Sequence, residues 1–249
     1  DSVLAYLNKV EEMGFSKRVF GVKQIERDLQ RLRTLDVDTG VKNVNRVAAR
    51  LEYNLTKAFL RYTAGQHYGF TNPSQIFNRL DVREKDSVRT TYRVLFDVPI
   101  KRASKDFYTM ALRKVYNDSV ALFLREVQPQ NALYAQLIKY FKGKTLSSAD
   151  RVRMLCNLER SRWRQNDYPQ NHRKYVIVNV PSFHLDAVDG DSVLNMRMAC
   201  GTLETKTPLL NSCFIRMDVN PQWIIPRSII KKEVVGHAGN PDYFSKRRY

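Results

Sequence analysis

Residues 44–62 read VNRVAARLEYNLTKAFLRY, and the apolar side chains of this stretch recur every three or four positions. Such spacing predicts a long amphipathic helix whose apolar stripe is buried against other elements. The stripe consists of Val44, Val47, Leu51, Leu55, Ala58, Phe59 and Tyr62. It decides the fold class of the N-terminal part, because one-sided helices of this kind become stable by packing on one another.

The flanking sequence, up to about residue 165, has the same helical period. Further helices are expected over residues 2–13, 22–32, 108–122, 129–141 and 148–163. Gly14 would end the first helix and Pro129 fits the first turn of the fourth. Ser147 or Ser148 would cap the last. We therefore predict a helical scaffold domain over residues 1–146.

The chain changes period after this helical region. Residues 174–180 mix β-branched and polar side chains, and residues 183–188 alternate along the chain. Asp189-Gly190-Asp191 is a tight-turn signal, so residues 192–200 are expected to return as the second strand of a hairpin. Another strand is expected over residues 209–217. So few strands make only part of a sheet and leave an open edge.

The predicted fold class is therefore α+β. A helical bundle scaffold is followed, over residues 147–249, by a linking helix and an incomplete β-rich domain. The 43% of hydrophobic residues supply enough apolar material for a core. No apolar run is long enough to span a bilayer, so we predict no transmembrane segment. The sequence leaves the oligomeric state open.

The formal net charge of +17 would attract polyanions such as nucleic acid, anionic lipid or anionic cell-wall polymer. The basic residues are spread through helices that also carry acids, which favours an ordinary solvated surface. Nucleic-acid binding would need a basic stripe with interleaved aromatic residues or a groove-binding helix. Neither pattern is found, so we predict no nucleic-acid partner.

Reactive and metal-binding residue types are sparse. The three cysteines are an odd number, and Cys156 and Cys200 are expected to be small buried hydrophobes. The four histidines do not have the spacing of metal ligands, and the sequence contains neither a Cys-x-x-Cys pair nor a Gly-rich phosphate loop. We therefore predict no metal site and no cofactor.

Three stretches follow one another in the second half of the chain: NLERSRW at 157–163, YVIVNVPSFHL at 175–185 and VNPQWIIPRSI at 219–229. Their order and spacing resemble the lead-in to the catalytic domain of the large periplasmic L,D-transpeptidases, which have a YkuD-type cysteine domain and remodel peptidoglycan. Residues 51–62 are similar to a helix of that family's scaffold domain. The resemblance assigns mainly structural motif roles to Asn157, Glu159, Arg160, Trp163, Asn220, Pro221, Trp223 and Pro226.

The resemblance implies an exported, periplasmic protein whose partners are peptidoglycan stem peptides or the cell-wall polymer. In the complete enzyme a Cys thiolate, assisted by His, attacks the L-centre carbonyl of diaminopimelate in a tetrapeptide stem, and D-Ala leaves. An amine of a neighbouring stem then resolves the acyl-enzyme into a cross-link between diaminopimelate residues. Backbone N–H groups would hold the oxyanion.

The family's nucleophile motif, of the form His…Ser-x-Gly-Cys-x-Arg, is absent from these residues. We therefore expect a truncation before the motif, assign no catalytic residue, and predict that this chain alone is inactive. Residues 212–217 are superficially similar to the motif, but they lack its Gly and precede residues 220–223. Strand alternation explains them instead, with Cys213, Ile215 and Met217 on one face.

Several alternatives stay open from the sequence. Instead of belonging to a transpeptidase, the chain could be a non-catalytic periplasmic scaffold or binding protein of the cell wall. Trp163 and Trp223 could pack a helix against the sheet or stack on sugars. The arginines at 160, 162 and 164 could offset the dipole at a helix C-terminus or bind an anion.

Overall fold

The computed structural model describes residues 2–34, 41–85, 88–143, 145–222 and 224–247 of the chain. It divides into two compact units, Asp1–Asn211 and Ser212–Tyr249. The first unit combines several helices with small sheets, which confirms the predicted α+β class. None of the described helices has the length and apolar character needed to cross a membrane.

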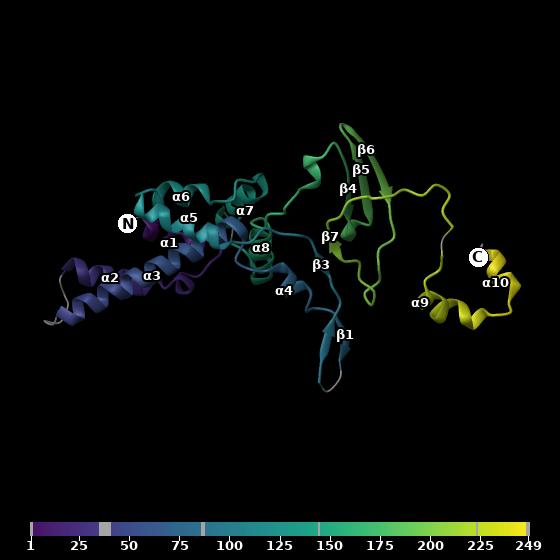
Figure 1. Ribbon diagram of the computed structural model, residues 1–249, viewed down its shortest axis with the longest axis horizontal. Coiled ribbons are helices and arrows are strands. Elements are labelled where there is room, and N and C mark those ends of the chain that lie inside the picture. Colours follow the sequence, from purple (N-terminus) through teal and green to yellow (C-terminus); the bar gives the residue numbers. More distant parts are fainter. Residues whose placement is uncertain (1, 35–40, 86–87, 144, 223, 248–249) are drawn as a thin grey trace. The chain divides into compact units, whose positions relative to one another are not determined.

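The helix predicted from the apolar stripe is α3 (Val41–Tyr68), the long helix in Figure 1. It packs against α2 (Val22–Thr34). The spacing of apolar residues over 22–32 predicts this second helix. The first predicted helix is divided into α1 (Ser2–Asn8) and a 3-10 turn, η1 (Val10–Met13), and a second 3-10 turn follows as η2 (Lys17–Phe20). These elements share one core that includes Leu7, Val10, Phe20, Val22, Ile25, Ala58, Phe59 and Tyr62.

A buried carboxylate ties α2 to α3. Asp28 is fully buried and accepts hydrogen bonds from Nε of Arg50 at 2.8 Å and from a terminal nitrogen of Arg50 at 2.5 Å. Nε2 of Gln24 donates a further bond at 2.9 Å. The hydrogen bonds from Arg50 hold the pKa of Asp28 below its usual value.

The region predicted as one helix over residues 108–122 is two helices, α5 (Lys105–Tyr116) and α6 (Val120–Glu126). The break lies at Asp118, whose φ of 50° is left-handed, a conformation that Asp tolerates better than most residues. Phe107 of α5 and Phe123 of α6 enter the same core. The apolar period therefore runs across the break and does not reveal it.

The next two helices differ in how well the sequence located them. α7 (Ala132–Gly143) begins after the predicted Pro129, because the side chain of Asn131 accepts the N–H of Tyr134 at 2.8 Å and caps the helix. α8 (Ser148–Arg160) is capped by Ser147, one of the two predicted caps, and Ser147 accepts the N–H of Asp150 at 3.1 Å. Trp163 lies beyond the end of this helix.

Short strands interrupt the region that was predicted to be wholly helical. β1 (Val82–Lys85) and β2 (Thr90–Tyr92) form an antiparallel pair, and β3 (Phe96–Asp97) pairs in parallel with β7 (Leu209–Leu210). The short helix α4 (Pro73–Phe77) precedes them. Strands of two to four residues are too short for a period of two to be recognised.

The predicted hairpin is confirmed. β5 (His184–Asp189) and β6 (Ser192–Arg197) pair antiparallel, and β4 (Lys174–Asn179) pairs with the other edge of β5. The 3-10 turns η3 (Pro169–Asn171) and η4 (Val180–Ser182) flank β4. The register places one apolar face on this sheet, formed by Val176, Val178, Leu185, Ala187, Leu194 and Met196.

Three cysteine-related predictions need correction. The strand predicted over residues 209–217 stops at Leu210, and the exposed Cys213 lies in irregular chain. Cys156 is exposed, whereas Leu158 of the same helix is buried in its place. Cys200 is half-buried and lies beyond β6.

The second unit contains short helical segments: α9 (Arg227–Ile229), the π-helical turn η5 (Ile230–Val234), the 3-10 turn η6 (Val235–His237) and α10 (Pro241–Arg247). The rings of His237 and Tyr243 stack with centroids 4.0 Å apart. The hydroxyl of Tyr243 donates to the carbonyl of Glu233 at 3.1 Å. These contacts join η6 and η5 to α10.

Candidate functional site

One arginine is buried inside the helical part of the first unit. Arg162 follows the end of α8 and is only 2% exposed. Its Nε donates a hydrogen bond to Oε1 of Gln66 at 2.9 Å. One terminal nitrogen donates to the carbonyl of Met13 at 3.3 Å and to the hydroxyl of Tyr134 at 3.4 Å. These bonds connect the end of α8 with α3, η1 and α7.

Aromatic rings and one carboxylate replace the water that this guanidinium would have in solution. Its centre lies 4.7 Å from the ring centroid of Phe15, 5.1 Å from that of Tyr134 and 5.8 Å from that of Phe70. A terminal nitrogen lies 3.7 Å from Oε2 of Glu159. A buried cation is tolerated only with such compensation, so the loss of one partner is costly.

Glu159 links the same region to the chain that follows α3. Its Oε1 accepts hydrogen bonds from the backbone N–H of Thr71 at 2.7 Å and from the hydroxyl of Thr71 at 2.9 Å. Nε1 of Trp163 donates to the same oxygen at 3.2 Å. One carboxylate therefore binds two residues of its own motif, Arg162 and Trp163, and a distant loop.

Trp163 lies on the other side of Glu159, among aromatic rings. Its ring meets Phe77 of α4 edge-on at 6.4 Å between centroids and Phe96 of β3 at 6.1 Å. Gly69 lies beneath it with φ +88°, and a Cβ there would be 2.5 Å from Cδ1 of Trp163. The close approach and the left-handed backbone both require glycine.

We name this group of contacts the junction cluster; its members are Gln66, Thr71, Tyr134, Glu159, Arg162 and Trp163. It joins the motif at 157–163 to the preceding helices and to β3. The Glu159 oxygen that accepts from the Thr71 hydroxyl also accepts from the Thr71 backbone N–H and from Trp163, so the contacts of the cluster are those of a clamp that orients the end of α8.

The predicted motif residues fall into three groups. Glu159 and Trp163 belong to the junction cluster. Asn157 and Arg160 lie on the exposed side of α8, where the Arg160 guanidinium is 5.8 Å from the Phe77 ring. The others belong to the second unit, where Asn220 has a left-handed φ of 51° and Pro221 and Pro226 are exposed, while Trp223 lies outside the described residues.

The sequence did not predict that Arg162 is buried, nor that Gln66 and Tyr134 form hydrogen bonds with it. The only local signal was the spacing of three between Glu159 and Arg162, which places both on one side of a helical turn. Because Gln66 lies 96 positions away from Arg162, no local pattern could connect them.

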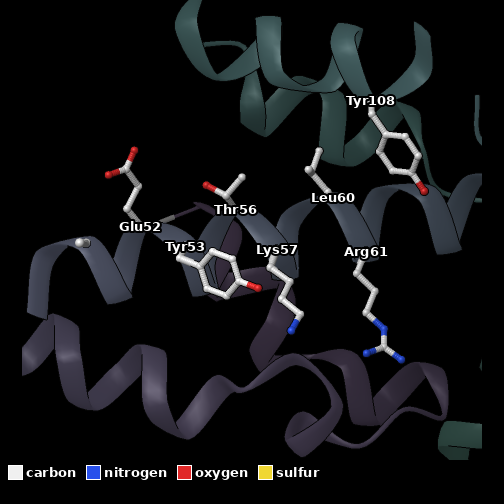
Figure 2. Close-up of a pocket in the computed structure, with 8 residues that line it drawn as sticks. Glu52, Tyr53, Thr56, Lys57, Leu60, Arg61 and Tyr108 are labelled. Carbon is white, nitrogen blue, oxygen red and sulfur yellow. The ribbon is translucent and has the colours of Figure 1, made fainter. Parts of the chain in front are cut away.

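A groove of about 710 Å³ runs along the solvent side of α3. It is lined by Ala49, Glu52, Tyr53, Thr56, Lys57, Leu60 and Arg61 of α3 and by Tyr108 of α5. Figure 2 shows Tyr53, Lys57 and Arg61 as one row along the helix and Glu52, Thr56 and Leu60 as a second row. We name this surface the α3 groove. Its two rows follow from residues four positions apart sharing one side of a helix.

Two titratable groups near the core have shifted pKa values. Burial lowers the pKa of His67 to about 4, with smaller contributions from the positive charges of Arg164 and Lys101. Nδ1 of His67 is buried without a hydrogen-bond partner, and its ring stacks on Phe107 at 5.6 Å between centroids. Burial raises the pKa of Tyr62 to about 12. Neither residue has the geometry of a catalytic pair.

Within the part of the chain that the structure describes, no three His, Cys, Asp or Glu side chains gather in a way that could hold a metal ion. Cys213 is exposed and lies in irregular chain.

Comparison with known proteins gives two matches. A family model described as "Scaffold domain" matches residues 1–140. A protein of Haemophilus influenzae, provisionally named an L,D-transpeptidase, is 28% identical over 143 residues, which are 55% of this chain and 28% of that protein. The match thus spans less than a third of the length of this relative. No solved structure matches the chain.

Proposed function

Because the family model covers residues 1–140, the chain belongs to the scaffold-domain family, and from that premise we propose that it is the scaffold part of an L,D-transpeptidase that remodels peptidoglycan. The observation that carries this proposal is the agreement between the family match and the relative from Haemophilus influenzae. The collinear motifs at 157–163, 175–185 and 219–229 support it independently.

We propose a different role for each of the two parts of the sequence. Residues 1–146 form the scaffold, and residues 147–249 contain the linking helix and the beginning of the β-rich transpeptidase-like domain. The whole protein would act in the periplasm and form cross-links between diaminopimelate residues through a Cys acyl-enzyme. We propose that the 249 residues alone are inactive, since they do not contain the nucleophile motif.

In this proposal the junction cluster positions the transpeptidase part on the scaffold. Glu159 and Arg162 precede β4 by a short connection, and both are fixed to residues within the matched 1–140 region through Thr71 and Gln66. A rigid clamp at this point would set where the following strands begin. Precise positioning of reacting groups is a large part of enzymatic rate enhancement.

The test uses the protein produced from the uninterrupted reading frame that contains this chain. Incubated with peptidoglycan bearing tetrapeptide stems, it should release D-Ala and form diaminopimelate-to-diaminopimelate cross-links. A folded protein that gives neither product would contradict the transpeptidase proposal. Binding of peptidoglycan without reaction would favour a non-catalytic scaffold of the cell wall.

A further inference from the structure

The α3 groove exposes two aromatic rings in one place. The exposed fraction is 64% for Tyr53 of α3 and 38% for Tyr108 of α5. A tyrosine ring combines an apolar face, which can stack on the flat face of a sugar ring, with a hydroxyl that can form hydrogen bonds. Both residues line the same groove, and Figure 2 shows Tyr53 on α3 and Tyr108 on the neighbouring helix.

Two cations lie in the same row as Tyr53. Nζ of Lys57 is 5.6 Å from the ring centroid of Tyr53. The Arg61 guanidinium is 5.9 Å from the ring of Phe20 and donates to the carbonyl of Val19 at 3.3 Å. These contacts hold the two side chains in place and leave further N–H donors for a ligand, because Lys has three and Arg five.

The polar groups of the second row have different roles. Glu52 is the acidic residue among those that line the groove, and Thr56 supplies a hydroxyl that can donate or accept. Leu60 supplies the apolar part of the lining. The groove therefore offers stacking surfaces, hydroxyl groups and two positive charges in one row.

From this combination we propose that the α3 groove binds a glycan strand of peptidoglycan, with sugar rings against Tyr53 and Tyr108 and stem-peptide carboxylates against Lys57 and Arg61. The choice of this carbohydrate rests on the proposed function. The pairing of carboxylate with Lys and Arg also agrees with the net charge of +17, which favours an anionic polymer over a neutral one.

The experiment measures binding of the 249-residue chain to soluble, uncross-linked glycan chains that carry tetrapeptide stems. The variant Tyr53→Ala/Lys57→Ala removes one ring and one cation from exposed helical positions, where Ala is well tolerated. Its affinity should fall roughly tenfold, the loss expected from one stacking and one charged contact. The matched control Tyr116→Ala/Lys105→Ala changes two exposed residues of α5 outside the groove and should bind like the parent chain.

Two further measurements identify the contacts. Tyr53→Phe keeps the ring and should keep most of the affinity. The same glycan without its stems should bind more weakly to the parent chain and show less dependence on salt, because it has lost the carboxylates of the stems and keeps only the lactyl carboxylate of each muramic acid. Circular dichroism of each variant checks that the helices are intact.

Each result decides the proposal. Equal binding by the parent and by Tyr53→Ala/Lys57→Ala would overturn the groove assignment while peptidoglycan binding itself stood. Equal losses in the groove variant and the α5 control would overturn it as well. If the parent chain does not bind the glycan, the inference is wrong, and the transpeptidase proposal is judged separately by D-Ala release from the protein of the uninterrupted reading frame.

Discussion

Nε of Arg162 donates to Oε1 of Gln66 at 2.9 Å, although the two residues are 96 positions apart in the sequence. Gln66 is part of α3 inside the scaffold match, whereas Arg162 follows α8 outside it. This buried bond therefore joins the recognised domain to the segment that leads toward β4. Its strength should determine how firmly the two are held together.

Replacing Arg162 tests this directly. Arg162→Ala leaves Gln66, Tyr134 and Glu159 without their common partner, and buried networks broken on one side typically lose about 3–5 kcal/mol. The free energy of unfolding, measured in urea by far-UV circular dichroism, should fall accordingly. The exposed neighbour Arg160→Ala should change it by less than about 1 kcal/mol. Similar small effects for both would mean that the junction cluster does not hold the fold together.

The close approach of Gly69 to Trp163 gives a second prediction. Gly69→Ala must strain a backbone at φ +88° and displace the indole, since the new Cβ would be 2.5 Å from it. We expect a loss of about 1–3 kcal/mol in the free energy of unfolding. Gly143→Ala meets no atom within 4 Å and should be neutral or slightly stabilising. A thermal melt of the two variants compares them; equal midpoints would refute the packing of Trp163 on Gly69.

His67 should make the fold sensitive to acid. Burial lowers its pKa to about 4, while an unfolded His titrates near 6.5, so the unfolded chain binds a proton first as the pH falls. The stability contribution of neutral His67 is full above pH 6.5 and is lost progressively between about pH 6.5 and pH 4.

His67→Phe tests that dependence, because Phe keeps the stacking on Phe107 and cannot titrate. Urea unfolding across the same pH range should give a shallower slope for the variant than for the parent chain. Buried carboxylates such as Asp28 contribute equally to both proteins and cancel in the difference. Parallel slopes would show that His67 is accessible to protons in the folded state.

The purified 249-residue chain should not release D-Ala from a tetrapeptide stem. Cys213 is exposed in irregular chain, and activation of a thiol requires a base or cation and an oxyanion hole. Chromatography of the reaction mixture after prolonged incubation checks this outcome. If the parent chain releases D-Ala and Cys213→Ala does not, Cys213 is the nucleophile, and the proposal that the 249 residues alone are inactive is wrong.

Local patterns predicted much of the first unit. The stripe of residues 44–62 identified α3, and Asp189-Gly190-Asp191 identified the turn between β5 and β6. The same patterns failed where a left-handed residue separates two helices, as at Asp118, and where the pairing of β7 with β3 ends, as beyond Leu210. The end of α5 depends on the backbone conformation of Asp118, and the end of β7 depends on its pairing with β3. Hydrophobic spacing encodes neither.

The sequence by itself determined the apolar face of α3, the capping of α8 by one of two adjacent serines and the turn at Asp189-Gly190-Asp191, because these depend on neighbours within about one or two helical turns. Only the tertiary structure decided that Arg162 is buried while Arg160 is exposed. The same is true of the pairing of β3 with β7 and of the glycine required at position 69. The physical reason is that burial and close contact depend on chain segments far apart in sequence, and these meet only when the helices pack.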